Sequence, residues 1–255
     1  FLATQSLLPI MALRLAAPSL LVDLNAIPAL RETVISDDRM RVGAMVTHAM
    51  NAASFDIWMH LPLMSQALHH VAHQAVRNRG TFGGSLAHAD AGAEMPLILA
   101  ALGGEVILRS LGGERAVPAA DFFQGHYVTA IEAGEILVAA DLPFSPLTWA
   151  FEELARRSGD LAISMAAVGV GLEDNICREA RIWLGSIADR PLRAEAAEDY
   201  LRGRTLDDSV IREAAQLATA DIHPRSDGHA NADYRRAVTS ALVRRALARI
   251  AAGDI

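Results

Sequence analysis

The sequence predicts an α+β protein of two domains, residues 1–146 and 147–255. Patterns typical of helices and of strands alternate along the first part of the chain. The segment Pro143-Phe144-Ser145-Pro146 interrupts them and is the expected domain boundary. Beyond it, three strand-like runs separated by turns predict an antiparallel meander, and the remainder is helical in pattern. The chain is long enough to bury a hydrophobic core.

The composition narrows the classes of partner and cofactor. A net charge of −7 and a pI near 5.7 argue against nucleic acid or an anionic membrane as a partner. Cys177 is the single cysteine, which excludes an internal disulfide framework and an iron–sulfur cluster held by this chain alone. No uncharged apolar run approaches a membrane span. The chain begins without Met or a secretory signal, so we expect it to start inside a domain of a cytoplasmic protein.

The first residues suggest a turn between a strand and a helix. Phe1-Leu2-Ala3 is expected to end a strand, and Ser6 to cap a helix that carries Pro9 in its first turn and runs to Leu15. Leu20 to Leu24 is expected to be the next strand. A tight polar loop before a helix suits a pyrophosphate, whose charge the helix N-terminus favours. An ordinary turn explains the same pattern.

The next stretch contains short strands at residues 33–35 and 40–43, then two expected helices, Val46 to Ala53 and Leu61 to Ala75. His69 and His73 are four residues apart on the second helix, a spacing that zinc ligands use. No third ligand follows at a suitable spacing. We therefore expect these histidines to be solvated or locally hydrogen-bonded.

The most distinctive segment is Arg77 to Glu94. Gly83-Gly84 permits a tight turn and the close approach of another molecule to the backbone, because glycine has no Cβ. Polar side chains follow in quick succession at Ser85, His88, Asp90 and Glu94. Taken alone, the segment is either a plain turn or a cradle for a phosphate-bearing cofactor.

The remaining elements have clear patterns. Gly103-Gly104 is expected to end a helix over Met95 to Leu102. Strands are expected at residues 105–110, 115–118, 135–142, 148–155, 165–172 and 180–184. Helices are expected over 194–202, from 208 or 209 to about 220, and from Asp233 to the end. Gly169-Val170-Gly171 lies within a strand pattern and opens no helix, so it is not a dinucleotide fingerprint.

Two turns, Ala3 to Leu7 and Thr81 to Ser85, together resemble those of the FAD-binding medium subunits of molybdenum hydroxylases. That family includes the medium subunits of carbon monoxide, aldehyde and xanthine dehydrogenases. The resemblance extends over essentially the whole chain. Its motifs are Gln5-Ser6-Leu7-Leu8-Pro9, Leu21-Val22-Asp23-Leu24-Asn25, Gly43-Ala44 with Thr47-His48, Arg77 to Glu94, Arg156-Arg157 with Gly159-Asp160-Leu161-Ala162, Leu201-Arg202-Gly203 and Tyr234-Arg235-Arg236.

The resemblance implies a fold and a cofactor site. The first domain would be a p-cresol-methylhydroxylase-type FAD-binding domain, and the second a flavoprotein domain of antiparallel sheet with helices. FAD would lie between them, with both turns on its pyrophosphate and backbone N–H groups among the donors. The cofactor-binding residues implied are Ala3, Thr4, Gln5, Ser6, Leu7, Thr81, Phe82, Gly83, Gly84, Ser85, His88, Asp90, Glu94, Asp160, Leu161 and Arg178.

The sequence departs from the family pattern at its beginning. The family's first turn usually has Ala-Gly-Gly before Gln-Ser, whereas this chain has Leu2-Ala3-Thr4. A Cβ then stands where the backbone would approach the diphosphate. The strand–helix–strand unit that precedes this turn in the family is also missing, as is the iron–sulfur insertion of some relatives, so the FAD-binding domain is expected to be incomplete.

The function implied is electron transfer within a complex. Substrate would be hydroxylated at a molybdenum–pterin centre on a large subunit, and electrons would pass through [2Fe-2S] clusters on a small subunit to this FAD. The assembly would be a dimer of heterotrimers, and the acceptor is open between NAD, oxygen, a quinone and a cytochrome. No catalytic residue or metal ligand is expected on this chain. The alternatives are a cofactor-poor structural subunit of the same complex and a stand-alone flavin oxidoreductase.

Overall fold

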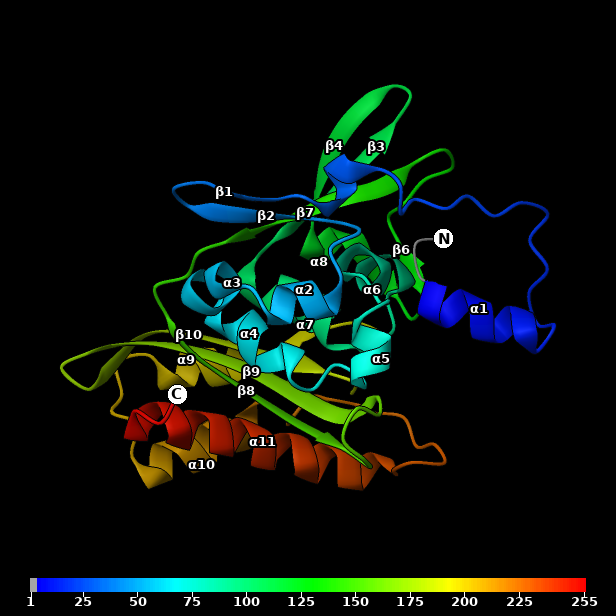
Figure 1. Cartoon of the computed structure of the whole chain (residues 1–255). Helices are drawn as coiled ribbons and strands as arrows, with labels where there is room; N and C mark the ends of the chain where they lie inside the picture. Colours follow the sequence, from blue (N-terminus) through cyan, green and yellow to red (C-terminus); the bar gives the residue numbers. More distant parts are fainter. Residues whose placement is uncertain (1–3) are drawn as a thin grey trace.

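The computed structural model describes residues 4–255. The chain begins with helix α1 (Thr4–Ala12), which stands apart from the body of the protein on a long irregular connection (Figure 1). The expected strand Leu20 to Leu24 is wrong: this segment is irregular, and Leu20 and Val22 are 76% and 70% exposed. Within the described chain it pairs with no strand, and an apolar run cannot form a strand without a partner. Ser6 also does not cap α1, because the helix already includes Thr4.

The first sheet is antiparallel with strand order β1-β2-β7-β3-β4. Its register places Met40 opposite Leu142 and Val106 opposite Ala140, so that these apolar side chains share the buried face. The guanidinium of Arg41 donates two hydrogen bonds of 2.7 Å to the carboxylate of Asp141 on the neighbouring strand. The strands are β1 (Thr33–Ile35), β2 (Arg39–Gly43), β3 (Glu105–Ser110), β4 (Gly113–Pro118) and β7 (Ile136–Pro143).

A layer of short helices covers one face of this sheet (Figure 1). It comprises α2 (His48–Ala52), α3 (Phe55–His60), α4 (Pro62–Leu68), α5 (Gln74–Arg77), α6 (Phe82–His88) and α7 (Glu94–Leu102). The smaller elements are η1 (Pro28–Arg31), α8 (Ala119–Phe122), β5 (Phe123–Gly125) and β6 (Val128–Thr129). The single helix expected over 61–75 is instead α4 and α5, because Ala72 adopts a left-handed φ of 40° between them. This break separates His69 from His73.

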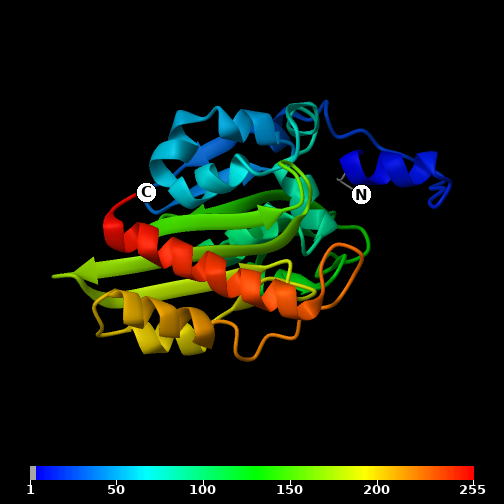
Figure 2. The ribbon, with the colours of Figure 1, turned by 90° about the horizontal axis from the view of Figure 1, so that it is seen from below.

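The second sheet is antiparallel with strand order β11-β10-β9-β8, which confirms the expected meander. Its strands are β8 (Thr148–Ala155), β9 (Ala162–Glu173), β10 (Ile176–Gly185) and β11 (Leu192–Arg193). Three helices cover its outer face (Figure 2): α9 (Glu195–Leu201), α10 (Asp208–Leu217) and α11 (Ala232–Ala252). The side chain of Asn231, rather than the expected Asp233, caps α11.

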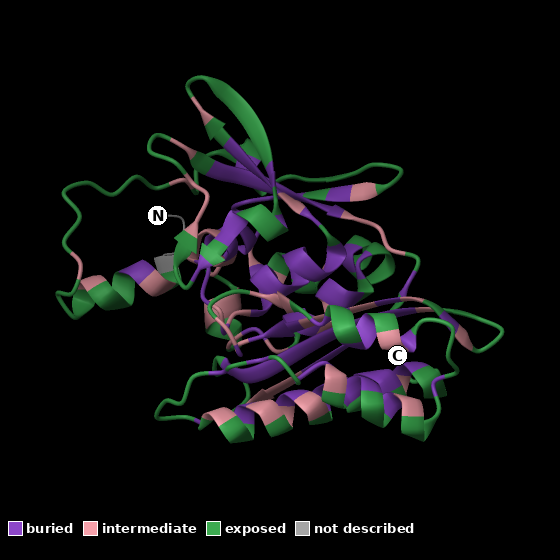
Figure 3. Ribbon diagram, turned by 180° about the vertical axis from the view of Figure 1, so that it is seen from behind, coloured by how far each residue is buried: buried purple, intermediate pink, exposed green. Residues whose placement is uncertain are grey.

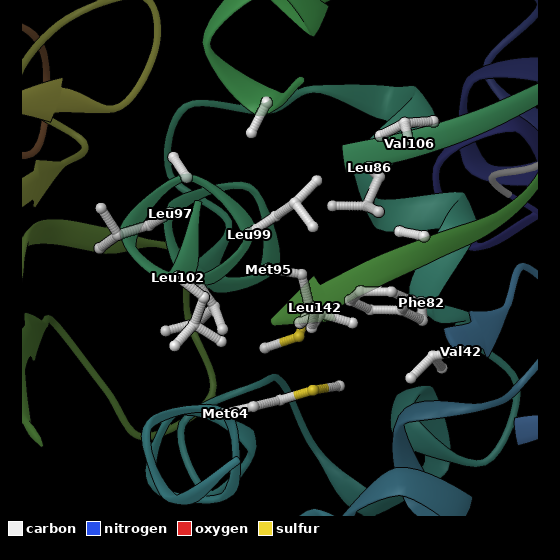
Figure 4. Close-up of a cluster of buried hydrophobic side chains, with 14 of the residues drawn as sticks. Val42, Met64, Phe82, Leu86, Met95, Leu97, Leu99, Leu102, Val106 and Leu142 are labelled. Carbon is white, nitrogen blue, oxygen red and sulfur yellow. The ribbon is translucent and has the colours of Figure 1, made fainter. Parts of the chain in front are cut away.

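Helix α7 lies between the two sheets and is buried along its whole length, and the central parts of the neighbouring strands β7 and β9 are buried as well (Figure 3). An all-apolar helix needs such a position because it has no face to expose. Met95 of α7 lies near Leu142, Phe82 and Met64, and Leu99 points toward Leu86 (Figure 4). In the part of the chain that the structure describes, no helix is both long and apolar enough to cross a membrane.

Candidate functional site

Two neighbouring cavities, which share three lining residues, open between the layers of the molecule. The smaller has a volume of about 270 Å³ and is lined by α1, α2, the break between α4 and α5, α6 and the first residues of α7. The larger, of about 640 Å³, is lined by the loop after α6, the β5–β6 turn, the end of β10 and the loop before α11. Asp90, Asp160 and Leu161 line both. Together the cavities lie in the size range of a site for a large cofactor.

The Thr81 turn is built into the first domain by pairing with the start of α2. Thr47 and Thr81 form an antiparallel bridge, which sets the N-termini of α2 and α6 side by side. Thr81 accepts at 3.1 Å from the N–H of Gly84, while the N–H groups of Phe82 and Gly83 donate to the carbonyls of Val46 and Ala44. These N–H groups, expected as phosphate donors, are therefore already bonded within the protein.

Glycine is needed at different positions of this turn for different physical reasons. A Cβ on Gly83 would meet the Cβ of Ala44 at 2.5 Å, so Gly83 allows α6 to pack on the chain after β2. A Cβ on Gly80 would meet the ring of His48 at 3.1 Å. Gly84 lines the smaller cavity, whereas Phe82 and Gly83 do not. Of the Gly83-Gly84 pair, Gly84 is thus the residue positioned to admit a ligand.

The first residues of α1, which belong to the segment expected as a turn over Ala3 to Leu7, meet the Thr81 turn at the smaller cavity. Gln5 and Ser6 line this cavity together with Thr81, Gly84 and Ser85. Leu7 is buried but does not line it, and Thr4 begins α1. Ala3 lies outside the described residues.

His48 is a polar residue of this cavity that the sequence did not single out as a binding residue. It is 5% exposed, and its Nδ1 has no hydrogen-bond partner in the described protein. Burial, with a smaller effect from the charge of Arg77, lowers the pKa of His48 to about 4, so the ring is neutral at pH 7. A buried and unpaired ring nitrogen is a suitable contact for a polar ligand.

Asp90 lines both cavities. One of its carboxylate oxygens accepts from the N–H of Gly92 at 2.9 Å, and the other accepts from the hydroxyl of Tyr127 at 3.1 Å. The Tyr127 ring in turn lies against His88, with 4.7 Å between centroids. Burial, then the charge of Asp90 and the hydrogen bond to it, raise the pKa of Tyr127 to about 12. The Asp90 carboxylate therefore holds Tyr127 and the backbone of Gly92 in place where the two cavities adjoin.

Two carboxyl groups are buried beside the smaller cavity. Glu94, the first residue of α7, lines the cavity, and burial raises its pKa to about 7. Glu153 on β8 lies behind it, with a side chain 3% exposed. Burial, and next the charge of Glu94, raise the pKa of Glu153 to about 8. The sequence predicted Glu94 but not Glu153, whose burial follows from the packing of β8 on α4.

Arg235 fixes the wall of the larger cavity. Its guanidinium, 7% exposed, pairs with Asp227 at 2.6 Å and donates to the carbonyls of Ile163 and Ser186 at 2.6 and 3.3 Å. The N–H of Ser186 in turn donates to the carbonyl of Ala91 in the first domain. Helix α11 is thereby tied to the loop that carries Asp90.

Arg178, which the resemblance implied as a cofactor-binding residue, lines neither cavity. Arg178 is at the start of β10 and pairs with Glu173 at 3.2 Å. Ser186, where that strand meets the larger cavity, is eight residues further on, about 26 Å along an extended chain. The histidine pair His69 and His73 is split by the break between α4 and α5. Among residues 4–255 there is no group of three or more His, Cys, Asp and Glu side chains that could hold a metal ion.

Comparison with known proteins gives matches along both domains. The family described as FAD binding domain in molybdopterin dehydrogenase matches residues 2–145, and the CO dehydrogenase flavoprotein C-terminal domain matches residues 149–250. The nicotine 6-hydroxylase medium subunit of Paenarthrobacter nicotinovorans is 41% identical over 95% of this chain and 86% of its own. The carbon monoxide dehydrogenase medium chain of Hydrogenophaga pseudoflava is 36% identical over 95% and 85%.

Solved structures agree with the sequence relatives. The quinoline 2-oxidoreductase of Pseudomonas putida 86 includes a chain that is 47% identical and superposes with a TM-score of 0.96, covering 98% of this chain and 88% of that one. The predicted fold class is therefore confirmed. This chain belongs to the FAD-binding medium-subunit family of the molybdenum hydroxylases.

Proposed function

We propose that this chain holds FAD across the two neighbouring cavities and passes electrons from a partner's iron–sulfur clusters to an external acceptor. The observation that carries the proposal is that Gln5 and Ser6 line the smaller cavity together with Thr81, Gly84 and Ser85, and that this cavity shares Asp160 and Leu161 with the larger one. The two sets of residues come from different parts of the chain. Their convergence on one cavity supports a shared ligand.

The placement assigns each group of residues a task. Gln5, Ser6, Thr81 and Ser85 would bind the diphosphate through their side chains, and Gly84 would leave room for it. His88, Asp90 and Glu94 would bind along the sugar-alcohol part, while Asp160 and Leu161 would contact the ring system from the second domain. Arg178 is left out of this placement because of its distance from both cavities. We place the domain boundary at residues 146 and 147.

FAD supplies the redox chemistry when it is bound, and the protein orients it and excludes water. This chain offers no cluster ligands of its own: Cys177 is its single cysteine, and the thiol is buried. We therefore assign the [2Fe-2S] clusters to a small partner subunit and the molybdenum–pterin centre to a large one, in a cytoplasmic dimer of heterotrimers. The names of the relatives as medium subunits of hydroxylases and dehydrogenases support this assignment.

Co-purification tests the proposal. The chain is produced with the products of its neighbouring genes, the complex is isolated, and the absorption spectrum of each separated subunit is recorded. We expect a flavin spectrum on this chain, with molybdenum and iron–sulfur absorption on its partners. Flavin with turnover in the isolated chain would contradict the proposal and indicate a stand-alone oxidoreductase. A colourless chain within an active complex would indicate a structural subunit.

A further inference from the structure

We propose that Glu94 and Glu153 retain a proton at neutral pH and make FAD binding proton-linked, so that the cofactor is bound more tightly below neutral pH than above it. Glu94 would meet FAD as a neutral hydrogen-bond donor, and Glu153 would be a positioning residue that acts through Glu94. The inference rests on the proposed placement of the diphosphate in the smaller cavity.

The smaller cavity has an electrostatic problem as a diphosphate site. The titratable residues that line it are His48, His88, Asp90, Glu94 and Asp160, and no arginine of the described chain is among them. The guanidinium of Arg77 donates to the carbonyls of Val71 and Ala72, two residues of the cavity wall, at 2.8 and 2.7 Å. An anionic ligand would therefore face carboxyl groups without a compensating cation, and like charges at short range repel strongly where water is excluded.

Glu153 lies on the face of β8 that has no arginine partner within residues 4–255, unlike its neighbour Glu152. Glu152 and Glu153 are successive residues of β8, so their side chains point to opposite faces of the sheet. Glu152 faces α11, where Arg249 and Arg245 pair with it at 3.0 and 3.1 Å. Glu153 faces α4, and its Oε2 has no hydrogen-bond partner in the described protein.

The surroundings of the two carboxyls favour their neutral forms. The other oxygen of Glu153 is 3.9 Å from Nδ1 of His70, a ring whose pKa burial lowers, so His70 is a poor source of positive charge near pH 7. Asp90 also raises the pKa of Glu94, while the N–H of Glu94 itself lowers it. Burial likewise lowers the pKa of His88. Ionising both carboxyls in this space places like charges together without a counter-ion.

FAD binding is expected to be linked to the uptake of protons rather than to their release. Bound FAD brings negative charge toward Glu94 and so stabilises its protonated form. Above pH 7, where free Glu94 has begun to ionise, binding must therefore take up protons from solution. Each linked proton weakens FAD binding by about tenfold per pH unit over the range in which it is taken up.

The experiment measures proton uptake directly. FAD is titrated calorimetrically into the flavin-free full-length chain at pH 6, 7, 8 and 9, in buffers of different ionisation enthalpy, and the difference in heat gives the protons taken up. The same titrations use E94Q, E153Q and the double variant. E195Q is the control, because Glu195 is 74% exposed on α9. Glutamine keeps the shape of each side chain, and circular dichroism checks that each variant is folded.

We expect the wild-type protein and E195Q to take up about one proton per FAD at pH 8 and to bind FAD at least about tenfold more weakly at pH 9 than at pH 6. E94Q and the double variant should take up none and bind with a nearly constant Kd, and E153Q should take up fewer protons than the wild type. A constant wild-type Kd without proton uptake would overturn the proposal, and E153Q identical to the wild type would remove Glu153 from it. No FAD binding even at pH 6 would instead contradict the proposed cofactor placement.

Discussion

The two turns that meet at the smaller cavity differ in how firmly the protein holds them. Around the Thr81 turn, Phe82 and Leu86 are fully buried, and the first N–H groups of α6 are bonded to Thr81, Val46 and Ala44. The described residues of the other turn are the start of helix α1, which buries Leu7, while Leu8 and Ile10 are 49% and 38% exposed. One turn is part of the hydrophobic core and the other lies on a peripheral arm.

Two turns of similar sequence can therefore contribute differently to the affinity of one site for its ligand. A turn that is already fixed loses little conformational entropy when a ligand binds, whereas a loosely packed arm must be ordered at that moment. We therefore expect the Thr81 turn to dominate the affinity for FAD and the α1 arm to modulate it.

Gly84→Val should give the largest effect. Its side chain would occupy the smaller cavity, which Gly84 lines. We expect the affinity for FAD to fall at least about 100-fold, or about 2.7 kcal/mol, measured by quenching of flavin fluorescence. Gly112→Val is the control, because a Cβ there meets nothing closer than the Ser110 hydroxyl at 3.5 Å. Flavin retained by Gly84→Val would show that the Thr81 turn is not the main contact.

Gly83→Ala separates packing from binding within the same turn. Its Cβ would meet that of Ala44 at 2.5 Å, so the helix must shift. We expect the free energy of unfolding to fall by about 2–3 kcal/mol, as for other overpacked sites, measured by urea denaturation of the flavin-free protein. A loss of FAD affinity at unchanged stability would contradict this separation of Gly83 from Gly84.

Acid should destabilise the protein through His48, which lies beside the Thr81 turn. His48 lies against Gly80 and is buried in its neutral form, with its pKa lowered to about 4. The unfolded chain binds this proton more readily, so stability is full above pH 6.5 and falls as the pH drops toward 4. We expect a loss of about 2 kcal/mol between pH 7 and pH 5 from this group.

Denaturation curves at several pH values check this expectation. His48→Gln should remove that part of the pH dependence, and His223→Gln, at an exposed position, should keep it. Equal slopes for His48→Gln and the wild type would assign the acid sensitivity to other groups.

Replacing Ala3 and Thr4 by glycines should give the smallest effect. The substitution restores the usual family turn and removes a Cβ from the approach to the diphosphate. Because the arm is peripheral, we expect FAD affinity to rise only several-fold, or about 1 kcal/mol. The expectation rests on the sequence, since Ala3 lies outside the described residues. A gain as large as the loss in Gly84→Val would reverse the ranking of the two turns.

The sequence predicted elements that have local signals and missed features that depend on distant neighbours. The β3–β4 hairpin and the meander of β8, β9 and β10 have alternating patterns between turn residues, and the structure confirms them. The break between α4 and α5 at Ala72 contains no glycine or proline from which it could be predicted. Leu20 to Leu24 has strand composition, but pairing depends on another strand rather than on composition.

The same distinction applies to the candidate site. The resemblance to the family supplied Gln5, Ser6, Gly84 and Glu94, which the structure brings to one cavity. It did not supply Glu153 as a partner of Glu94, because a glutamate in a strand gives no local sign that its side chain is buried. Such a role arises only when β8 packs against α4.

The complete burial of α7 has a consequence for cooperativity. Leu147, Trp149, Phe151 and Met165, from beyond the proposed boundary, belong to the same hydrophobic cluster as Met40 and the other core residues of the first sheet. Heat or denaturant that separates the sheets would expose an apolar helix on every side, so neither half has a stable state without the other. We expect one shared melting transition, in which the cavity walls are lost together.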